Sequence, residues 1–184
     1  MLSTGKISYY EKGISNETII CLHGIGGDYE SFEPQVNGLS DKYRIISWNM
    51  PGYRDSKPLE KYSFENLSIA LNEFLINLTR CNIPYPDIYE MLGYNLSVPA
   101  RICRVLLERV ADNDAIITKL KIPTLITHGD DDTSVLLSMA HHNHSLIKNS
   151  VLSIYKKTGH APFYEDPHRF SEELQEFTKH CYNT

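Results

Sequence analysis

Two groups of residues in this sequence could support acid–base and nucleophilic chemistry. The first is His23-Gly24, which directly follows the apolar run 19–22 and precedes Gly26 and Gly27. Backbone N–H groups left accessible by glycines after a buried strand form an anion-binding site. The alternative is that Gly26 and Gly27 only make a tight turn, because glycine tolerates positive φ. The stretch raises the question of which nucleophile would create an anion there.

The second group lies at the ends of two apolar segments. Asp130–Asp132 follow segment 122–127, and His160 follows segment 151–155. A carboxylate on one imidazole nitrogen fixes the tautomer and stabilises the imidazolium, which leaves the other nitrogen to take a proton from a nucleophile. The alternatives are a solvated loop for the aspartates and a structural histidine for His160.

Three further histidines, His141, His142 and His144, suggest a metal site. His141 and His144 are three residues apart and could share one face of a helix. No H-E-x-x-H motif and no Cys/His spacing typical of zinc accompanies them. We therefore expect a solvated helix face and no metal site.

The chemistry requires elements that place these residues at strand ends. Continuous apolar segments predict strands buried on both faces, and they cover 7–10, 18–22, 43–48, 122–127 and 151–155. Apolar residues three and four apart predict helices over 64–78 after an N-cap at Ser63, over 99–110, and from Asp166-Pro167 to 177. Alternating strands and helices predict a mostly parallel α/β sheet flanked by helices.

Composition limits the class of protein. The sequence has 184 residues, 41% hydrophobic and 22% charged, which is typical of one soluble globular domain with a sizeable core. A net charge of −5 without Lys/Arg clusters argues against nucleic-acid binding. No segment has the length of a membrane span, and the N-terminal residues lack a signal-peptide pattern. We expect a cytoplasmic protein with free cysteines, no cofactor, and no membrane or nucleic-acid partner.

The order and spacing of four motifs resemble the α/β-hydrolase family. They are L-H-G-x-G-G over 22–27, the turn over 49–56, G-D-D-D over 129–132, and G-H-A-P over 159–162. In that family the first motif supplies an oxyanion amide, and the acid precedes the base in the chain. The stretches 94–114, 122–132 and 159–167 look like bacterial non-haem haloperoxidase-like and arylesterase-like members.

The resemblance implies a role for each matching residue. Its G-x-x-D spacing makes Asp132, rather than Asp130 or Asp131, the acid, and its G-H motif makes His160 the base. The N–H of Ile25 becomes the oxyanion donor, with His23 and Gly24 in the same oxyanion and substrate-binding loop. The turn 49–56 departs from the family pattern D-x-P-G-x-G-x-S, because Asn49 replaces the aspartate and Arg54 the second glycine.

The family nucleophile is not identifiable in this chain. It sits in G-x-S-x-G on a strand-to-helix turn, and no such motif occurs in the 184 residues. We interpret 81–113 as the remnant of a cap region from which the nucleophile strand and most of the lid are missing. In an alternative alignment, Gly93–Ser97 occupies the motif with Asn95 at the nucleophile position. Ser97 and Cys103 are the nearest hydroxyl and thiol, and neither has the required context.

These observations predict a truncated α/β-hydrolase fold forming a single domain over 1–184. One hypothesis is a hydrolase of carboxylic esters or related acyl bonds, using a Ser-His-Asp-type mechanism on a small-molecule substrate. The alternative is a non-catalytic remnant or interaction protein of the same fold. Without the missing strands, we expect strand 18–22 to pair directly with strand 122–127. An edge left exposed instead would favour a homodimer.

Overall fold

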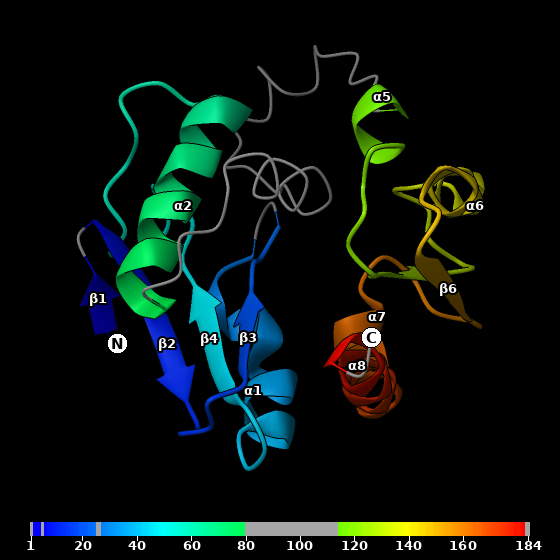
Figure 1. Ribbon diagram of the computed structural model, residues 1–184, viewed down its shortest axis with the longest axis horizontal. Helices are drawn as coiled ribbons and strands as arrows, with labels where there is room; N and C mark the ends of the chain where they lie inside the picture. The colour runs from blue at the N-terminus through cyan, green and yellow to red at the C-terminus, as the bar shows by residue number, and fades with distance from the viewer. Residues whose placement is uncertain (1, 5, 25–26, 80–113, 183–184) are drawn as a thin grey trace. The chain divides into compact units, whose positions relative to one another are not determined.

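The computed structural model describes residues 2–4, 6–24, 27–79 and 114–182 (Figure 1). The chain divides into two compact units, Met1–Ala111 and Asp112–Thr184. Each unit is described by itself below. The expectation of a single domain stays a prediction.

The first unit contains a four-stranded sheet in the order β1-β2-β4-β3. Its strands are β1 (Leu2–Thr4), β2 (Ile7–Lys12), β3 (Thr18–Cys21) and β4 (Arg44–Trp48). The pairs β1–β2 and β2–β4 are antiparallel, and β3 runs parallel to β4. The parallel pair matters for function, because the carboxyl ends of β3 and β4 carry the His23 loop and the 49–56 turn side by side.

Strand β4 is central because nearly every side chain on it is buried. Ile46 and Trp48 belong to the main apolar cluster, to which α2 (Phe64–Thr79) contributes Leu71 and Phe74. Side chains alternate along a strand, so Ile45 faces the opposite side, where α1 (Glu33–Leu39) lies. In Figure 1, α2 lies in front of this sheet and α1 behind it.

Helix α2 begins where the sequence predicts. The Asn66 N–H donates to the Ser63 hydroxyl at 3.1 Å, the bond expected from an N-cap serine. Before α1, Asp28 caps a short 3₁₀ helix, η1 (Tyr29–Phe32), by accepting from the Glu30 N–H at 2.8 Å. These caps fix where the chain leaves the ends of the strands.

The second unit is built on a parallel pair, β5 (Thr124–Gly129) and β6 (Ser150–Tyr155). Its helices are α5 (Asp114–Ile117), α6 (Leu137–Leu146), α7 (Pro162–Glu165) and α8 (Pro167–Tyr182). The predicted cap of α8 is present, because the Arg169 N–H donates to Asp166 Oδ1 at 3.3 Å.

A polar network attaches α8 to β6. The Glu173 carboxylate accepts from Ser153 Oγ at 2.9 Å and from the Tyr155 hydroxyl at 2.7 Å. Arg169 donates to Glu173 at 2.8 Å, and its guanidinium lies 3.8 Å from the centre of the buried Tyr155 ring. Burial and the Glu173 contact together raise the pKa of Tyr155, so its hydroxyl stays a donor. The network holds β6, whose carboxyl end leads to His160.

The predicted strands are all present, with ends that differ by at most two residues, and the two parallel pairs flanked by helices confirm the α/β class. The prediction that strand 18–22 pairs directly with strand 122–127 would join the two units, and it stays a prediction. Among the described strands, β3 hydrogen-bonds to β4 and β5 to β6, so each finds its parallel partner within its own unit. The helix predicted over 99–110 and the cap remnant over 81–113 lie outside the described residues.

Candidate active site

His23 follows β3 with its ring buried, 1% of the residue being exposed. The Met50 N–H donates to Nε2 at 3.0 Å, so Nε2 must carry a lone pair. The Gly24 carbonyl lies 2.8 Å from Nδ1 and can only accept, so Nδ1 carries the proton. Burial lowers the pKa of His23, against a smaller opposing contribution from the Gly24 bond. The ring is therefore a neutral scaffold joining the two strand ends.

Gly24 and Gly27 lie close together in the chain segment that follows His23. The Gly27 N–H donates to the Gly24 carbonyl at 3.2 Å. A Cβ on Gly27 would lie 2.6 Å from Ser31 Oγ, so the loop requires glycine there to let η1 approach. Ile25 and Gly26, between these positions, lie outside the described residues, and the role of the Ile25 N–H stays a prediction.

Asn49 explains how the 49–56 turn works without the family's aspartate. Its amide nitrogen donates to Ser8 Oγ at 2.8 Å, and its amide oxygen accepts from the Tyr29 N–H at 3.1 Å. The buried Ser56 hydroxyl donates to the Asn49 carbonyl at 2.6 Å and accepts from the Ser8 N–H at 2.9 Å. An amide can donate and accept at once, which a carboxylate cannot. Ser56 is thereby committed to holding the turn.

Arg54 stands where the family has its second glycine, and its backbone shows why. Its φ is 44°, in the left-handed region that favours glycine. The guanidinium reaches Asp28 Oδ2 from Nε at 2.6 Å and Glu30 Oε2 from Nη2 at 3.2 Å. The side chain thus links the turn to Asp28 and Glu30, which follow the His23 loop. The backbone of Arg54 is strained in this arrangement.

Asp132 follows β5 and lies close to His160. Its side chain is 3% exposed, and Oδ2 lies 2.8 Å from His160 Nδ1. Its other oxygen, Oδ1, accepts from the Ser134 N–H at 2.7 Å and the Val135 N–H at 3.0 Å. Burial raises the pKa of Asp132, but the bonds from Val135, His160 and Ser134 outweigh it and leave the pKa below its usual range. The carboxylate is therefore charged at neutral pH and aimed at the imidazole.

His160 differs from His23 in its exposure to solvent, because 64% of its side chain is exposed. A carboxylate accepts the proton on Nδ1, so Nε2 is the nitrogen with the free lone pair. Within the described part of the chain, Nε2 has no hydrogen-bond partner. This is the arrangement of a base available to an incoming proton.

The other two aspartates of the run have different partners. Asp130 accepts from the Lys157 N–H at 2.7 Å and pairs with Lys156 Nζ at 3.0 Å, and these bonds lower its pKa. The Asp131 N–H donates to the Thr158 carbonyl at 3.0 Å. The geometry thus places Asp132, and neither neighbour, at His160.

Gly129 allows this arrangement. A Cβ at this position would lie 2.1 Å from the carbonyl oxygens of both Thr158 and Gly159. Only glycine lets the end of β5 approach the loop that carries His160 so closely.

Sequence analysis missed two residues near this pair. Glu165 accepts hydrogen bonds from the backbone on both sides of His160. His128 Nε2 lies 3.8 Å from Asp132 Oδ2 and 3.1 Å from the Val135 carbonyl. The only sequence signal for Glu165 is its place five residues after His160.

The predicted solvated face of α6 agrees with the contacts of its histidines. His142 Nε2 lies 3.0 Å from Asp114 Oδ1, and His144 Nδ1 lies 2.8 Å from Ser150 Oγ. The described residues contain no group of three or more potential metal ligands. Ser97, Asn95 and Cys103 lie outside the described residues.

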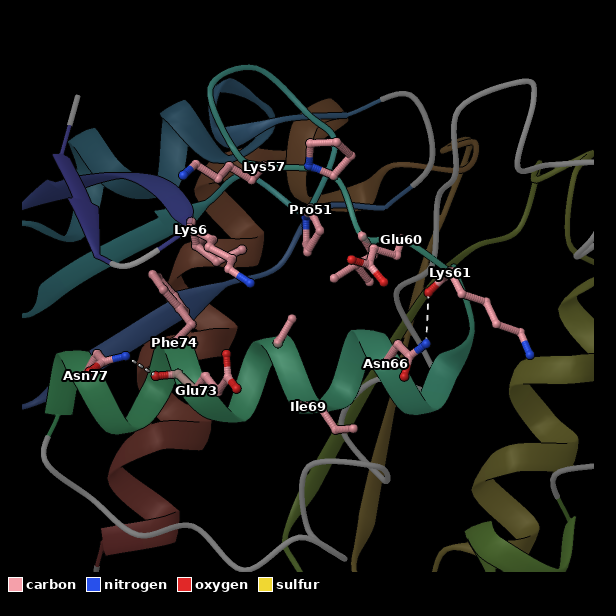
Figure 2. Close-up of a pocket in the computed structure, with 14 residues that line it drawn as sticks. Lys6, Pro51, Lys57, Glu60, Lys61, Asn66, Ile69, Glu73, Phe74 and Asn77 are labelled. Carbon is pink, nitrogen blue, oxygen red and sulfur yellow. Dashed lines mark hydrogen bonds between the residues drawn. The ribbon is translucent and has the colours of Figure 1, made fainter.

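A cavity of about 590 Å³ lies in the first unit (Figure 2). Ile7, Pro51 and Phe74 are among its apolar lining, and Lys6, Lys57, Lys61, Glu60 and Glu73 are its charged residues. No residue of the predicted site is part of its lining. Because both signs of charge occur, the cavity shows no preference for an anion or a cation.

Comparison with known proteins relates part of the chain to a known family. Residues 17–94 match the family described as "alpha/beta hydrolase fold". Over 58 residues the chain is 33% identical to (E)-2-((N-methylformamido)methylene)succinate hydrolase from Acinetobacter baylyi, covering 32% of this chain and 22% of that protein. The alignments span less than a quarter of the length of the curated relatives that the chain matches.

Two solved structures show how far the fold is shared. A thermophilic esterase from Thermogutta terrifontis superimposes with a TM-score of 0.76 at 13% identity, covering 95% of this chain and 93% of the esterase. A bromoperoxidase from Bacillus anthracis gives 0.74 at 17% identity, covering 94% and 95%. The matched segment and these superpositions show that the chain has an α/β-hydrolase fold. No helix in the described ranges is long and apolar enough to span a membrane.

Proposed function

We propose that this protein hydrolyses carboxylic esters or related acyl bonds, with Asp132 as the acid of the triad and His160 as the base. One observation carries the proposal: the 2.8 Å contact between the buried Asp132 carboxylate and Nδ1 of an imidazole whose side chain is 64% exposed. Structural histidines usually use both nitrogens, as His23 does. The hydrolase names of the relatives support the same reaction class.

The proposed reaction uses His160 twice. As the nucleophile's oxygen or sulfur bonds to the acyl carbon, Nε2 takes its proton and the carbonyl electron pair moves onto oxygen. Collapse of this intermediate breaks the bond to the leaving alcohol, which takes the proton from Nε2. Water then attacks the acyl-enzyme by the same route and releases the acid. Asp132 stays ionised and stabilises the imidazolium in both steps.

The oxyanion would be bound by the His23 loop. In this proposal the Ile25 N–H donates to it, while the buried His23 ring and Gly24 hold the turn on which Ile25 lies. A preorganised donor of this kind contributes about 3 to 4 kcal/mol to such a reaction.

The proposal does not assign the nucleophile to a residue. Covalent labelling identifies it. The folded chain is treated with a fluorophosphonate probe, and the modified residue is mapped by mass spectrometry. The proposal expects one labelled hydroxyl or thiol and loss of labelling in His160→Gln. Labelling at Ser97 that is lost in Ser97→Ala would place the nucleophile in that segment.

A second candidate is a non-catalytic protein of the same fold, favoured by the absence of G-x-S-x-G from the 184 residues. A monodisperse, folded sample that shows no labelling and no ester hydrolysis above that of His160→Gln would support this candidate and overturn the enzyme. Residual hydrolysis alone does not decide, because an oxyanion site retains some rate enhancement without the triad.

A further inference from the structure

The loop that carries His160 is held by a carboxylate outside the proposed triad. Glu165 Oε2 accepts from the Gly159 N–H at 2.9 Å, and Oε1 accepts from the Ala161 N–H at 3.0 Å. These two N–H groups flank His160 on either side. The carboxylate thereby bridges the backbone across the residue whose orientation matters most.

The position of Glu165 in α7 makes this bridge possible. The N–H groups of Tyr164 and Glu165 donate to the Ala161 carbonyl at 2.9 and 2.8 Å, which forms the first turn of the helix. Ala161 is the N-cap and has no side chain that could cap the helix. The Glu165 side chain turns back and satisfies the N-cap N–H, as the glutamate of a capping box does.

Gly159 provides an independent observation. A Cβ at this position would lie 3.2 Å from Glu165 Oε1 and 3.5 Å from Oε2. The first of these contacts is tighter than ordinary van der Waals packing, so a larger residue would push the carboxylate away. The glycine before His160 therefore gives the carboxylate room to approach the backbone.

His160 depends on such support because packing does not hold its ring. Its side chain is largely exposed, and Asp132 makes the only ring hydrogen bond in the described residues. The direction of the Cα–Cβ bond, fixed by the backbone of 159–161, thus decides whether Nδ1 meets Asp132. Both Glu165 oxygens are used by the backbone, so Glu165 orients the loop rather than serving as a second acid.

We propose that Glu165 is a positioning residue that holds His160 in the orientation that pairs Nδ1 with Asp132. For its effect on catalysis the proposal depends on the function proposed above, but its effect on His160 does not. The test therefore measures the imidazole itself as well as turnover.

The measurement is the tautomer of His160, read from ¹⁵N chemical shifts of histidine-labelled protein at about pH 8.5, where an ordinary imidazole is neutral. His160→Gln assigns the signal. In the wild type we expect the Nδ1–H form to dominate. Glu165→Gln keeps the size but can accept only one of the two N–H groups, and Glu165→Ala accepts neither. Both should shift His160 toward the Nε2–H form, with Glu165→Ala shifting it more.

Two further variants make the result specific. Gly159→Ala should shift the tautomer in the same direction, since it displaces the carboxylate without removing it. Glu172→Gln removes the same charge from α8, where Glu172 makes an exposed contact with His168, and should leave the tautomer unchanged. If one Glu165 variant fails to fold, the other and Gly159→Ala still give the measurement.

The outcomes separate the two proposals. A tautomer shift in the Glu165 variants without ester hydrolysis in the wild type would support Glu165 and overturn the proposed function. If the wild type is active, kcat of Glu165→Gln should fall about ten- to a hundredfold with KM unchanged. An unchanged His160 tautomer in folded Glu165→Gln and Glu165→Ala would overturn the role of Glu165.

Discussion

Two histidines at strand ends differ in every property that decides whether an imidazole can act as a base. His23 is buried, and the backbone of Gly24 and Met50 occupies both of its nitrogens. His160 is exposed, and within the described residues only its Nδ1 is hydrogen-bonded, to the carboxylate of Asp132. Both follow parallel strands and both adjoin a glycine, so the sequence motifs look alike.

In the proposed function, the partner on Nδ1 is what distinguishes the scaffold residue His23 from the base His160. A backbone carbonyl fixes the tautomer of His23 but offers little to an imidazolium, and burial opposes one. A carboxylate fixes the tautomer of His160 and also stabilises the positive charge that a base acquires. The predictions below test this contrast, from the largest expected effect to the smallest.

Removal of the exposed histidine should have the largest effect on catalysis. We expect His160→Gln to lower kcat/KM for p-nitrophenyl acetate at least about a thousandfold, because the nucleophile loses its base. The melting temperature should change little, since the ring is exposed. His168→Gln, another exposed histidine beside a carboxylate, is the matched control. Equal activity in both variants would show that His160 is not the base.

Removal of the buried histidine should act on stability instead. In His23→Leu the buried Met50 N–H loses its acceptor, and we expect the free energy of unfolding to fall by about 2 to 4 kcal/mol. Urea denaturation measures this loss. His144→Leu, which removes one exposed ring contact, should stay within about 0.5 kcal/mol of wild type. A stable His23→Leu would contradict the scaffold role.

The pH dependence of the free energy of unfolding should also show the contribution of the buried His23. Burial lowers the pKa of His23 from its ordinary value of 6.5, so below that pH the unfolded chain binds a proton that the folded chain does not. Its contribution is fully present above pH 6.5 and is lost as the pH falls through the folded pKa. The pKa of Asp132 is lowered from its ordinary value of 3.8, so its contribution to stability is also lost as the pH falls, but at more acidic pH. Urea midpoints of His23→Leu should therefore fall less steeply than those of the wild type between about pH 6.5 and 4. Parallel curves would contradict this assignment.

The smallest effect concerns the turn beside the His23 loop. Arg54→Ala keeps the positive φ but loses the exposed ion pairs, so it should cost up to about 1 kcal/mol. Arg54→Gly relieves the strain and should be more stable than Arg54→Ala by about 1 kcal/mol. At about 1 M NaCl the ion pairs are screened, and Arg54→Gly should then exceed the wild type. Equal stabilities of the alanine and glycine variants would show that Arg54 is unstrained.

Features set by local chemistry could be predicted from the sequence. Apolar segments predicted the five longer strands. Ser63 and Asp166 predicted the starts of α2 and α8. The G-x-x-D spacing predicted which aspartate contacts His160. Strand β1 and helix α1 were missed. Strand β1 has three residues and depends on pairing with β2, while α1 contains glycine and asparagine and depends on packing against β4.

Other features depend on tertiary contacts that no local pattern encodes. The difference between His23 and His160 depends on which groups reach the ring nitrogens: backbone groups for His23 and the Asp132 carboxylate for His160. The parallel partners of β3 and β5, which are β4 and β6, are set by packing between segments that are distant in the sequence. Glu165 was missed because its function lies in its return to the loop, which only coordinates reveal.

The most direct test of the central claim is a double-mutant cycle on Asp132 and His160. If the two act as one unit, Asp132→Asn, His160→Gln and the double variant should lose kcat/KM for p-nitrophenyl acetate to a similar extent, within roughly tenfold of one another. Circular dichroism confirms that each variant is folded. Losses that multiply in the double variant, or an Asp132→Asn variant as active as the wild type, would contradict the account.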